Sequence, residues 1–215
     1  WDALDGATLA TAAAAAARFK GEAGSVAEIF VPNAGTVRQV LLLGVGEGAA
    51  NDWGKAGGAL VARLLTSGAT AATLDLSALA TPPAADAVAR FAATAAQRAW
   101  RHDHYRTRLP DTQKPSLATV TIASAPAGID AAWIAQSAVT DGMALTRQLV
   151  TEPPNILYPE SFVERVRQAF EGTGATIEAL DEAAMRDLGM GALLGVSAGS
   201  AREAQLLVIH WQGAG

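Results

Sequence analysis

The chain has 215 residues, of which 50% are hydrophobic and 17% charged, and its mean hydropathy is +0.20. This composition excludes a disordered chain and a fibrous repeat, and a globular chain of this length buries roughly 70% of its unfolded surface. The absence of cysteine excludes disulfides, cysteine-based zinc sites and thiol nucleophiles.

The net charge of −5 comes from the last third of the chain. Residues 1–150 carry 12 Lys and Arg against 12 Asp and Glu, whereas residues 151–215 carry 4 against 9. Binding to a phosphate backbone needs a basic surface, so we expect no nucleic-acid partner. One local basic stretch remains, formed by Arg98, Arg101, Arg106 and Arg108. We interpret it as a helix end that is exposed to solvent.

No run of 18 apolar residues occurs, and the six alanines of residues 12–17 are too few and too weakly hydrophobic to span or target a membrane. We therefore expect a cytoplasmic protein without a membrane partner.

The first part of the chain alternates segments typical of strands and of helices. Apolar residues 40–43 lie within a strand that this pattern predicts to be covered on both faces. The predicted strands are Phe19–Val31, Arg38–Val45, Ala71–Leu76 and Thr119–Ala123, and the predicted helices are Lys55–Leu65 and Ala84–Trp100. This order predicts an α/β fold.

A helix of about 20 residues, roughly 30 Å long, is predicted over Ile129–Leu149. Pro153 and Pro154 end it, and we place a domain boundary there. Beyond the boundary, Pro159 opens a helix whose apolar face is formed by Phe162, Val163, Val166 and Phe170.

Two further strands are predicted, Ala175–Leu180 and Gln205–Trp211, with a short helix between them that Asp181 caps and that ends at Gly189. These last 65 residues supply one αβαβ unit. Two strands cannot close a doubly covered parallel sheet, so the second domain is expected to be unfinished at Gly215.

The segment Gly44-Val45-Gly46-Glu47-Gly48 lies between a predicted strand and a helix, where a phosphate-binding loop would lie. Its spacing departs from G-x-G-x-x-G, and Glu47 would oppose a pyrophosphate. A plain strand-to-helix turn is the favoured interpretation, and a nucleotide site, supported weakly by Asp75, is the alternative.

Two other patterns suggest chemistry. Gly195-Val196-Ser197-Ala198-Gly199 spells the G-x-S-x-G of serine hydrolases, but a following helix is lacking and His210 falls within a strand, so we interpret it as a glycine-rich loop. His102-Asp103-His104 offers two imidazoles, but arginines surround them and a third ligand is lacking. Surface histidines at a helix end are the favoured interpretation.

The segment from Leu149 to Phe162, LVTEPPNILYPESF, closely resembles the domain junction of the leucyl (cytosol) aminopeptidase family of di-metal peptidases. The resemblance continues through Leu188–Val196, Gly199-Ser200, Leu206–Trp211 and Gly213-Ala214. Upstream it is looser, at Phe19-Lys20-Gly21, Val40–Gly48 and Gly57-Gly58. Residues 101–108 depart from the family pattern, with Arg101 and His102 where the family has an aromatic residue.

The resemblance implies a three-layer, macro-domain-like amino-terminal domain at residues 1–128, a linker helix and junction at 129–155, and the beginning of a peptidase catalytic domain at 156–215. It also implies a cytoplasmic homo-oligomer, a hexamer, that removes N-terminal residues from peptides with two divalent ions, Mn or Zn. A nucleotide- or ADP-ribose-binding module of macro type is the alternative.

The resemblance assigns no catalytic, cofactor-binding or metal-ligating residue within this sequence. The family's metal motifs would lie beyond Gly215, and the three lysines, Lys20, Lys55 and Lys114, lie outside such motifs. The segment is therefore expected to bind no metal and to be inactive alone.

Overall fold

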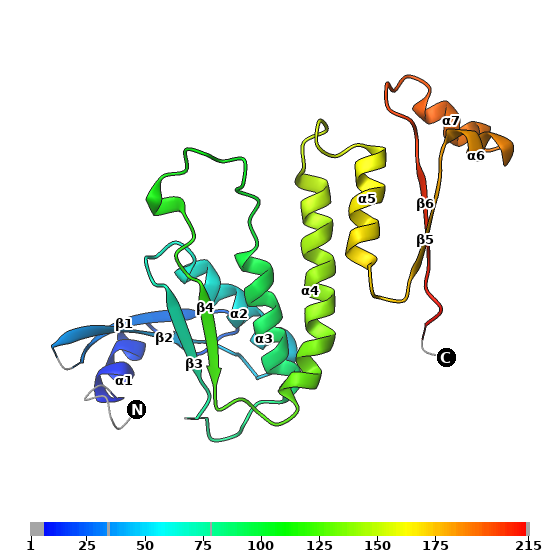
Figure 1. Ribbon diagram of the computed structural model, residues 1–215. Coiled ribbons are helices and arrows are strands. Elements are labelled where there is room, and N and C mark those ends of the chain that lie inside the picture. The colour runs from blue at the N-terminus through cyan, green and yellow to red at the C-terminus, as the bar shows by residue number, and fades with distance from the viewer. Residues whose placement is uncertain (1–6, 34, 78, 214–215) are drawn as a thin grey trace. The chain divides into compact units, whose positions relative to one another are not determined.

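The computed structural model describes residues 7–33, 35–77 and 79–213. Contacts divide the chain into two compact units, Trp1–Ala144 and Leu145–Gly215. Each unit combines helices with short strands, which agrees with the expected α/β class (Figure 1).

Unit 1 contains the long α2 and α3 helices and two pairs of strands. Its elements are α1 (Ala7–Ala16), β1 (Val26–Asn33), β2 (Thr36–Leu43), α2 (Ala50–Leu64), β3 (Ala71–Asp75), α3 (Ala85–Ala99), a 3-10 turn (Asp111–Gln113), β4 (Thr119–Ala123) and the first part of α4 (Ile129–Thr151). The order of strands and helices is the predicted one, with α1 added before it.

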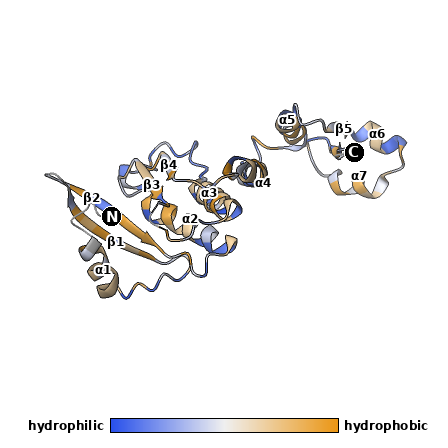
Figure 2. Cartoon of the chain, turned by 90° about the horizontal axis from the view of Figure 1, so that it is seen from below, coloured by the Kyte–Doolittle hydropathy of each residue, from blue (hydrophilic) through white to orange (hydrophobic). Residues whose placement is uncertain are grey.

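The strands of unit 1 form two separate pairs among the described residues. β1 and β2 are antiparallel, with Val26 opposite Leu43, whereas β3 and β4 are parallel, with Ala71 opposite Thr119. Figure 2 shows β1 and β2 as largely hydrophobic strands. Residues 40–43 of β2 are each half-buried, so both faces of this strand are covered only in part, which is less than the pattern predicts.

The core of unit 1 lies where α2 and α3 pack against each other and against the strands. Trp53 of α2 meets Phe91 of α3 edge-on, with ring centroids 6.3 Å apart. The buried residues of this core are Trp53, Ala56, Leu60, Leu64, Leu76, Ala87, Val88 and Phe91. Leu41 and Leu43 of β2 pack against it, which attaches the β1–β2 pair to α2.

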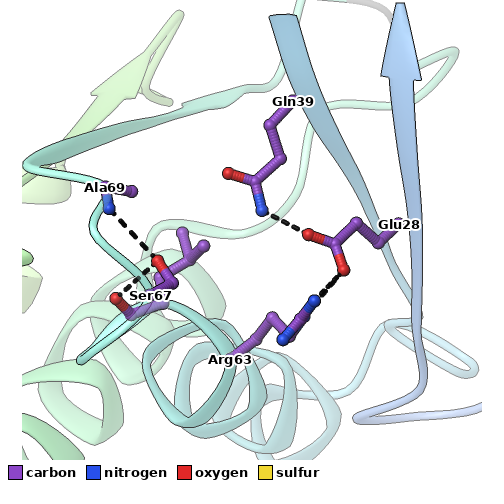
Figure 3. A network of polar contacts seen from close by, with 6 residues as sticks. Glu28, Gln39, Arg63, Ser67 and Ala69 are labelled. Carbon is purple, nitrogen blue, oxygen red and sulfur yellow. Dashed lines mark hydrogen bonds and ion pairs between the residues drawn. The ribbon is translucent and has the colours of Figure 1, made fainter. Parts of the chain in front are cut away.

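One polar network also joins the β1–β2 pair to α2 (Figure 3). The Glu28 carboxylate of β1 accepts hydrogen bonds from the Gln39 side-chain amide of β2 and from the Arg63 guanidinium of α2, whose Nε lies 2.9 Å from Glu28 Oε2. The guanidinium lowers the pKa of the Glu28 carboxyl, and Gln39 adds to this effect. The carboxylate thus fixes the strand pair relative to the last turn of the helix.

Unit 2 contains the end of α4, then α5 (Pro159–Phe170), β5 (Thr176–Leu180), α6 (Glu182–Asp187), α7 (Gly191–Ser197) and β6 (Leu206–His210). Its strands pair antiparallel, with Thr176 opposite His210, and not in the parallel manner of a doubly wound sheet. Met185 of α6 is fully buried, and Val163 and Val166 of α5 are also buried. Phe162, predicted on that same face, is instead 38% exposed.

One predicted strand begins later in the structure, whereas the predicted starts of two helices are confirmed. The strand predicted over Phe19–Val31 begins only at Val26, because Arg18, Gly21 and Gly24 have positive φ and form turns. Pro159 does open α5, and the Asp181 carboxylate caps α6 by accepting from Ala184 N at 2.8 Å.

Candidate functional site

The Gly44–Gly48 turn connects β2 to α2, as predicted for a phosphate loop. Its amide groups, however, are used within the protein. Gly44 N donates to Ser25 O at 2.8 Å, Gly46 N to Gly21 O at 2.9 Å and Gly48 N to Val45 O at 2.8 Å. These three amides are therefore engaged by carbonyls and do not face a phosphate.

The glycines of this turn are explained by close backbone packing at Gly44 and by positive φ at Gly46 and Gly48. A Cβ on Gly44 would lie 2.0 Å from the carbonyl oxygen of Glu22, so only glycine allows the two loops to meet. A Cβ on Gly46, whose φ is +52°, would lie 3.2 Å from an Asp52 carboxylate oxygen. The carboxylate of Asp52 beside the turn opposes an anionic ligand, which supports the plain strand-to-helix turn over the nucleotide alternative.

Residues 195–197 of the G-x-S-x-G segment form the end of α7 (Gly191–Ser197), and Ala198 and Gly199 lie in the turn that follows, so the interpretation of the whole segment as a glycine-rich loop is wrong. Ser197 is the last residue of α7, and its Oγ donates to Leu194 O at 3.0 Å. The same hydroxyl lies 3.5 Å from a Glu182 carboxylate oxygen, and His210 Nε2 lies 4.0 Å from Glu178. Each group thus has another partner, and the geometry of a Ser-His pair is not formed.

His102 and His104 lie in the loop after α3, which ends at Ala99. Their ring centroids are 4.2 Å apart, and both rings contact Tyr105. The intervening Asp103 carboxylate pairs with Arg101 and with Arg106, and the Arg101 hydrogen bond lowers its pKa. His104 is exposed, as expected, but His102 is half-buried in this aromatic cluster, so its prediction as a surface histidine at a helix end is wrong.

The junction after α4 is fixed by an ion pair that the sequence analysis did not single out. The Glu152 side chain is only 2% exposed, and its Oε1 lies 2.8 Å from Arg165 NH1 of α5. The sequence did contain a signal for this pair: Glu152 directly follows α4, and a carboxylate next to a helix C-terminus is unfavourable unless a cation compensates its charge. The pair ties the segment before Pro153 to α5.

The loop between α7 and β6 is held at two points within unit 2. The Arg202 guanidinium lies 4.0 Å from the centroid of the Tyr158 ring, at the N-terminus of α5. A Glu182 carboxylate oxygen accepts a hydrogen bond from Ala204 N at 3.0 Å. These two contacts fix the position of residues 202–204, which lead into β6.

The residues described here do not fit a two-metal centre. Di-metal peptidase sites use several carboxylates, but Glu152 is paired with Arg165, Asp181 caps α6, and Glu182 accepts from the backbone. All three lysines belong to unit 1. Within either unit taken alone, the described residues do not place three His, Asp or Glu side chains around a shared point.

Known structures share this α/β architecture. A tomato leucine aminopeptidase mutant superposes with a TM-score of 0.76 at 21% identity, over 94% of this chain and 40% of that one. The bottromycin maturation enzyme BotP in complex with Mn matches with a TM-score of 0.73 at 25% identity, over 93% of this chain and 42% of that one. The fold is therefore that of the corresponding part of a leucine aminopeptidase.

Family comparison agrees with the fold. The N-terminal domain of the cytosol aminopeptidase family matches residues 2–109, and the catalytic domain of the same family matches residues 144–215. The chain belongs to the cytosol aminopeptidase family, which confirms the resemblance noted in its sequence.

Curated relatives are named probable cytosol aminopeptidases. The one from Bradyrhizobium sp. is 40% identical over 94% of this chain and 41% of its own length. One from Rhodopseudomonas palustris is 41% identical over 97% of this chain and 43% of its own length. The chain thus spans about two fifths of these relatives. Among its described helices, none is both long and apolar enough to cross a membrane.

Proposed function

We propose that this chain is the amino-terminal part of a metallo-aminopeptidase that, as a whole protein, removes N-terminal residues from peptides. The observation that carries the proposal is the match of two successive domains of one family, in order, to residues 2–109 and 144–215. Curated relatives that align with most of this chain are more than twice as long as the aligned part.

Within that protein, residues 1–128 form a three-layer, macro-like accessory domain, residues 129–155 the linker helix and junction, and residues 156–215 the beginning of the catalytic domain. The helix-strand order of unit 1 and the tied junction at Glu152 and Arg165 support this division.

Two divalent ions, Mn or Zn, would activate water and polarise the scissile carbonyl in the whole enzyme. The relative BotP was solved with Mn, which supports a metal-dependent family chemistry. Because Glu152, Asp181 and Glu182 of unit 2 already have partners, we assign no metal to this segment and expect it to be inactive alone. Further proposals drawn from the family are peptide substrates, a cytoplasmic location and assembly as a homo-hexamer.

The test compares residues 1–215 with the complete gene product in hydrolysis of a leucyl anilide, each with Mn²⁺ and after chelation. The complete product is expected to show metal-dependent turnover and the segment none. Metal-dependent turnover by the segment alone would refute the proposal that the metal ligands lie in the rest of the whole protein. A complete product that is folded but inactive on a panel of aminoacyl anilides would refute the aminopeptidase assignment.

A further inference from the structure

Unit 1 contains an apolar cavity of about 600 Å³, open to solvent, between α3, β4 and the first turns of α4, and among its lining residues Ala96, Asp130 and Trp133 are exposed. Its volume falls within the range of about 300–1,000 Å³ that is typical of small-molecule sites. The residues that form it include Ala92 and Ala96 of α3, Val120 and Ile122 of β4, and Asp130 and Trp133 of α4. Both views show α3 and α4 next to each other (Figures 1 and 2).

The cavity has a physical origin in the contact between these two helices. Long polar side chains link them, with Arg90 NH1 3.3 Å from Gln136 Oε1 and Gln97 Nε2 3.2 Å from Thr140 Oγ1. The side chains that α3 presents to the cavity are mostly alanines, which are too small to fill the space between such linked helices.

The wall of the cavity carries one kind of charge. Asp130 is the single ionisable residue among those that line it, and Trp133, one turn further along α4, adds an aromatic side chain that is 37% exposed. Apolar walls favour a hydrocarbon body, whereas a carboxylate and an indole both favour a cation and disfavour an anion. The charge of the site thus complements an ammonium group.

We propose that this cavity binds a small apolar primary amine, with its alkyl chain against the alanines of α3 and its ammonium group at Asp130. An alkyl ammonium is chemically similar to the lysine side chain and stays protonated at pH 7. The proposal concerns unit 1 alone and does not depend on the aminopeptidase assignment.

Three probes with the same isopentyl group separate charge from apolar burial: isopentylamine, isopentanol and 4-methylpentanoate. In calorimetric titrations of the full 215-residue chain at low salt, the amine is expected to bind at least tenfold more tightly than the carboxylate, with the alcohol between them. Equal affinity for the amine and the carboxylate, or no binding of the amine at millimolar concentration, would overturn the proposal.

Two variants and one control locate the site. Asp130→Asn is expected to lower amine affinity about tenfold and to leave that of the alcohol unchanged, whereas Ala96→Leu, at an exposed position on the wall, is expected to weaken both. Asp141→Asn removes an exposed carboxylate of the same helix outside the cavity and should change neither. Circular dichroism confirms folding of each variant, and loss of amine affinity in Asp141→Asn equal to that in Asp130→Asn would show a non-specific charge effect.

Discussion

The carbonyl oxygen of Phe91 in α3 lies 2.2 Å from the position that a Cβ on Gly57 of α2 would occupy. The two helices therefore meet backbone to backbone, and Thr94 reinforces the contact by donating from Oγ1 to Gly54 O at 2.7 Å. Apart from its chain neighbours and the backbone of its own helix, no atom lies within 4 Å of the Cβ position of Gly58, the next residue. Neighbouring glycines in one helix thus have opposite structural requirements.

Gly57→Ala is expected to destabilise unit 1 by roughly 1–3 kcal/mol or more, because the obstructing atom is backbone and cannot turn away. Gly58→Ala should instead stabilise it by about 0.5–1 kcal/mol through helix propensity. Urea unfolding followed by tryptophan fluorescence measures both, in a variant that keeps buried Trp53 and has phenylalanine at the four other tryptophans. Similar effects of the two substitutions would show that α2 and α3 do not approach as described.

The pH dependence of unit 1 should reflect Glu28. Arg63 lowers the folded-state pKa of this carboxyl below its ordinary value of 4.5. A lowered folded pKa gives a stabilisation that is fully present above the unfolded pKa and is lost as the pH falls through the folded one. Because Arg63 is half-exposed, the pair should contribute no more than about 1 kcal/mol.

The measurement is a double-mutant cycle of Glu28→Gln and Arg63→Met in urea at several pH values. The coupling energy should be constant between pH 6 and 8 and shrink below about pH 4.5. A coupling energy that grows as the pH falls would contradict the direction of the shift. High salt should reduce it, because the guanidinium is reached by solvent.

The ion pair between Glu152 and Arg165 differs from the pair between Glu28 and Arg63 because its carboxylate is buried. Arg165→Met is expected to destabilise unit 2 by about 1–3 kcal/mol, since it removes a cation from a carboxylate that is 2% exposed. Arg167→Met, at an exposed position of the same helix, should change stability by less than about 0.5 kcal/mol. Hydrogen exchange of α5 amides measures the difference, and equal protection in both variants would refute the role of the pair.

Much of the fold could be predicted because it depends on local pattern. The apolar spacing of residues 162–170 located α5, and the alanine-rich composition of residues 84–100 located α3. α2 was predicted as a helix too, but it begins at Ala50 and not at Lys55. Pro159 and Asp181 marked the starts of α5 and α6. α7 was missed because Gly191 and Gly195 have low helix propensity, and its helix is set by its surroundings in the fold. Local signals also fail to distinguish a parallel from an antiparallel pairing of β5 and β6.

The side-chain contacts between elements could not be predicted from the sequence. Glu28 and Arg63 are 35 residues apart and meet only because β1 and α2 pack with one particular register. The alanine-lined cavity could not be predicted either, since the sequence of an alanine-rich helix does not show which of its faces lacks a partner.

The contact of Arg202 with the Tyr158 ring yields the last prediction. A guanidinium 4.0 Å from a ring centroid is within the range of a cation–π interaction, which is worth about 0.5–1 kcal/mol at an exposed site. Arg202→Met and Tyr158→Leu should each destabilise the loop before β6 by about this amount, and the double variant should cost little more than either one. Tyr158→Phe is the matched control, because it keeps the ring and should keep most of the interaction. Hydrogen exchange in residues 198–205 measures the effect, and additive losses in the double variant would show that the two side chains do not interact.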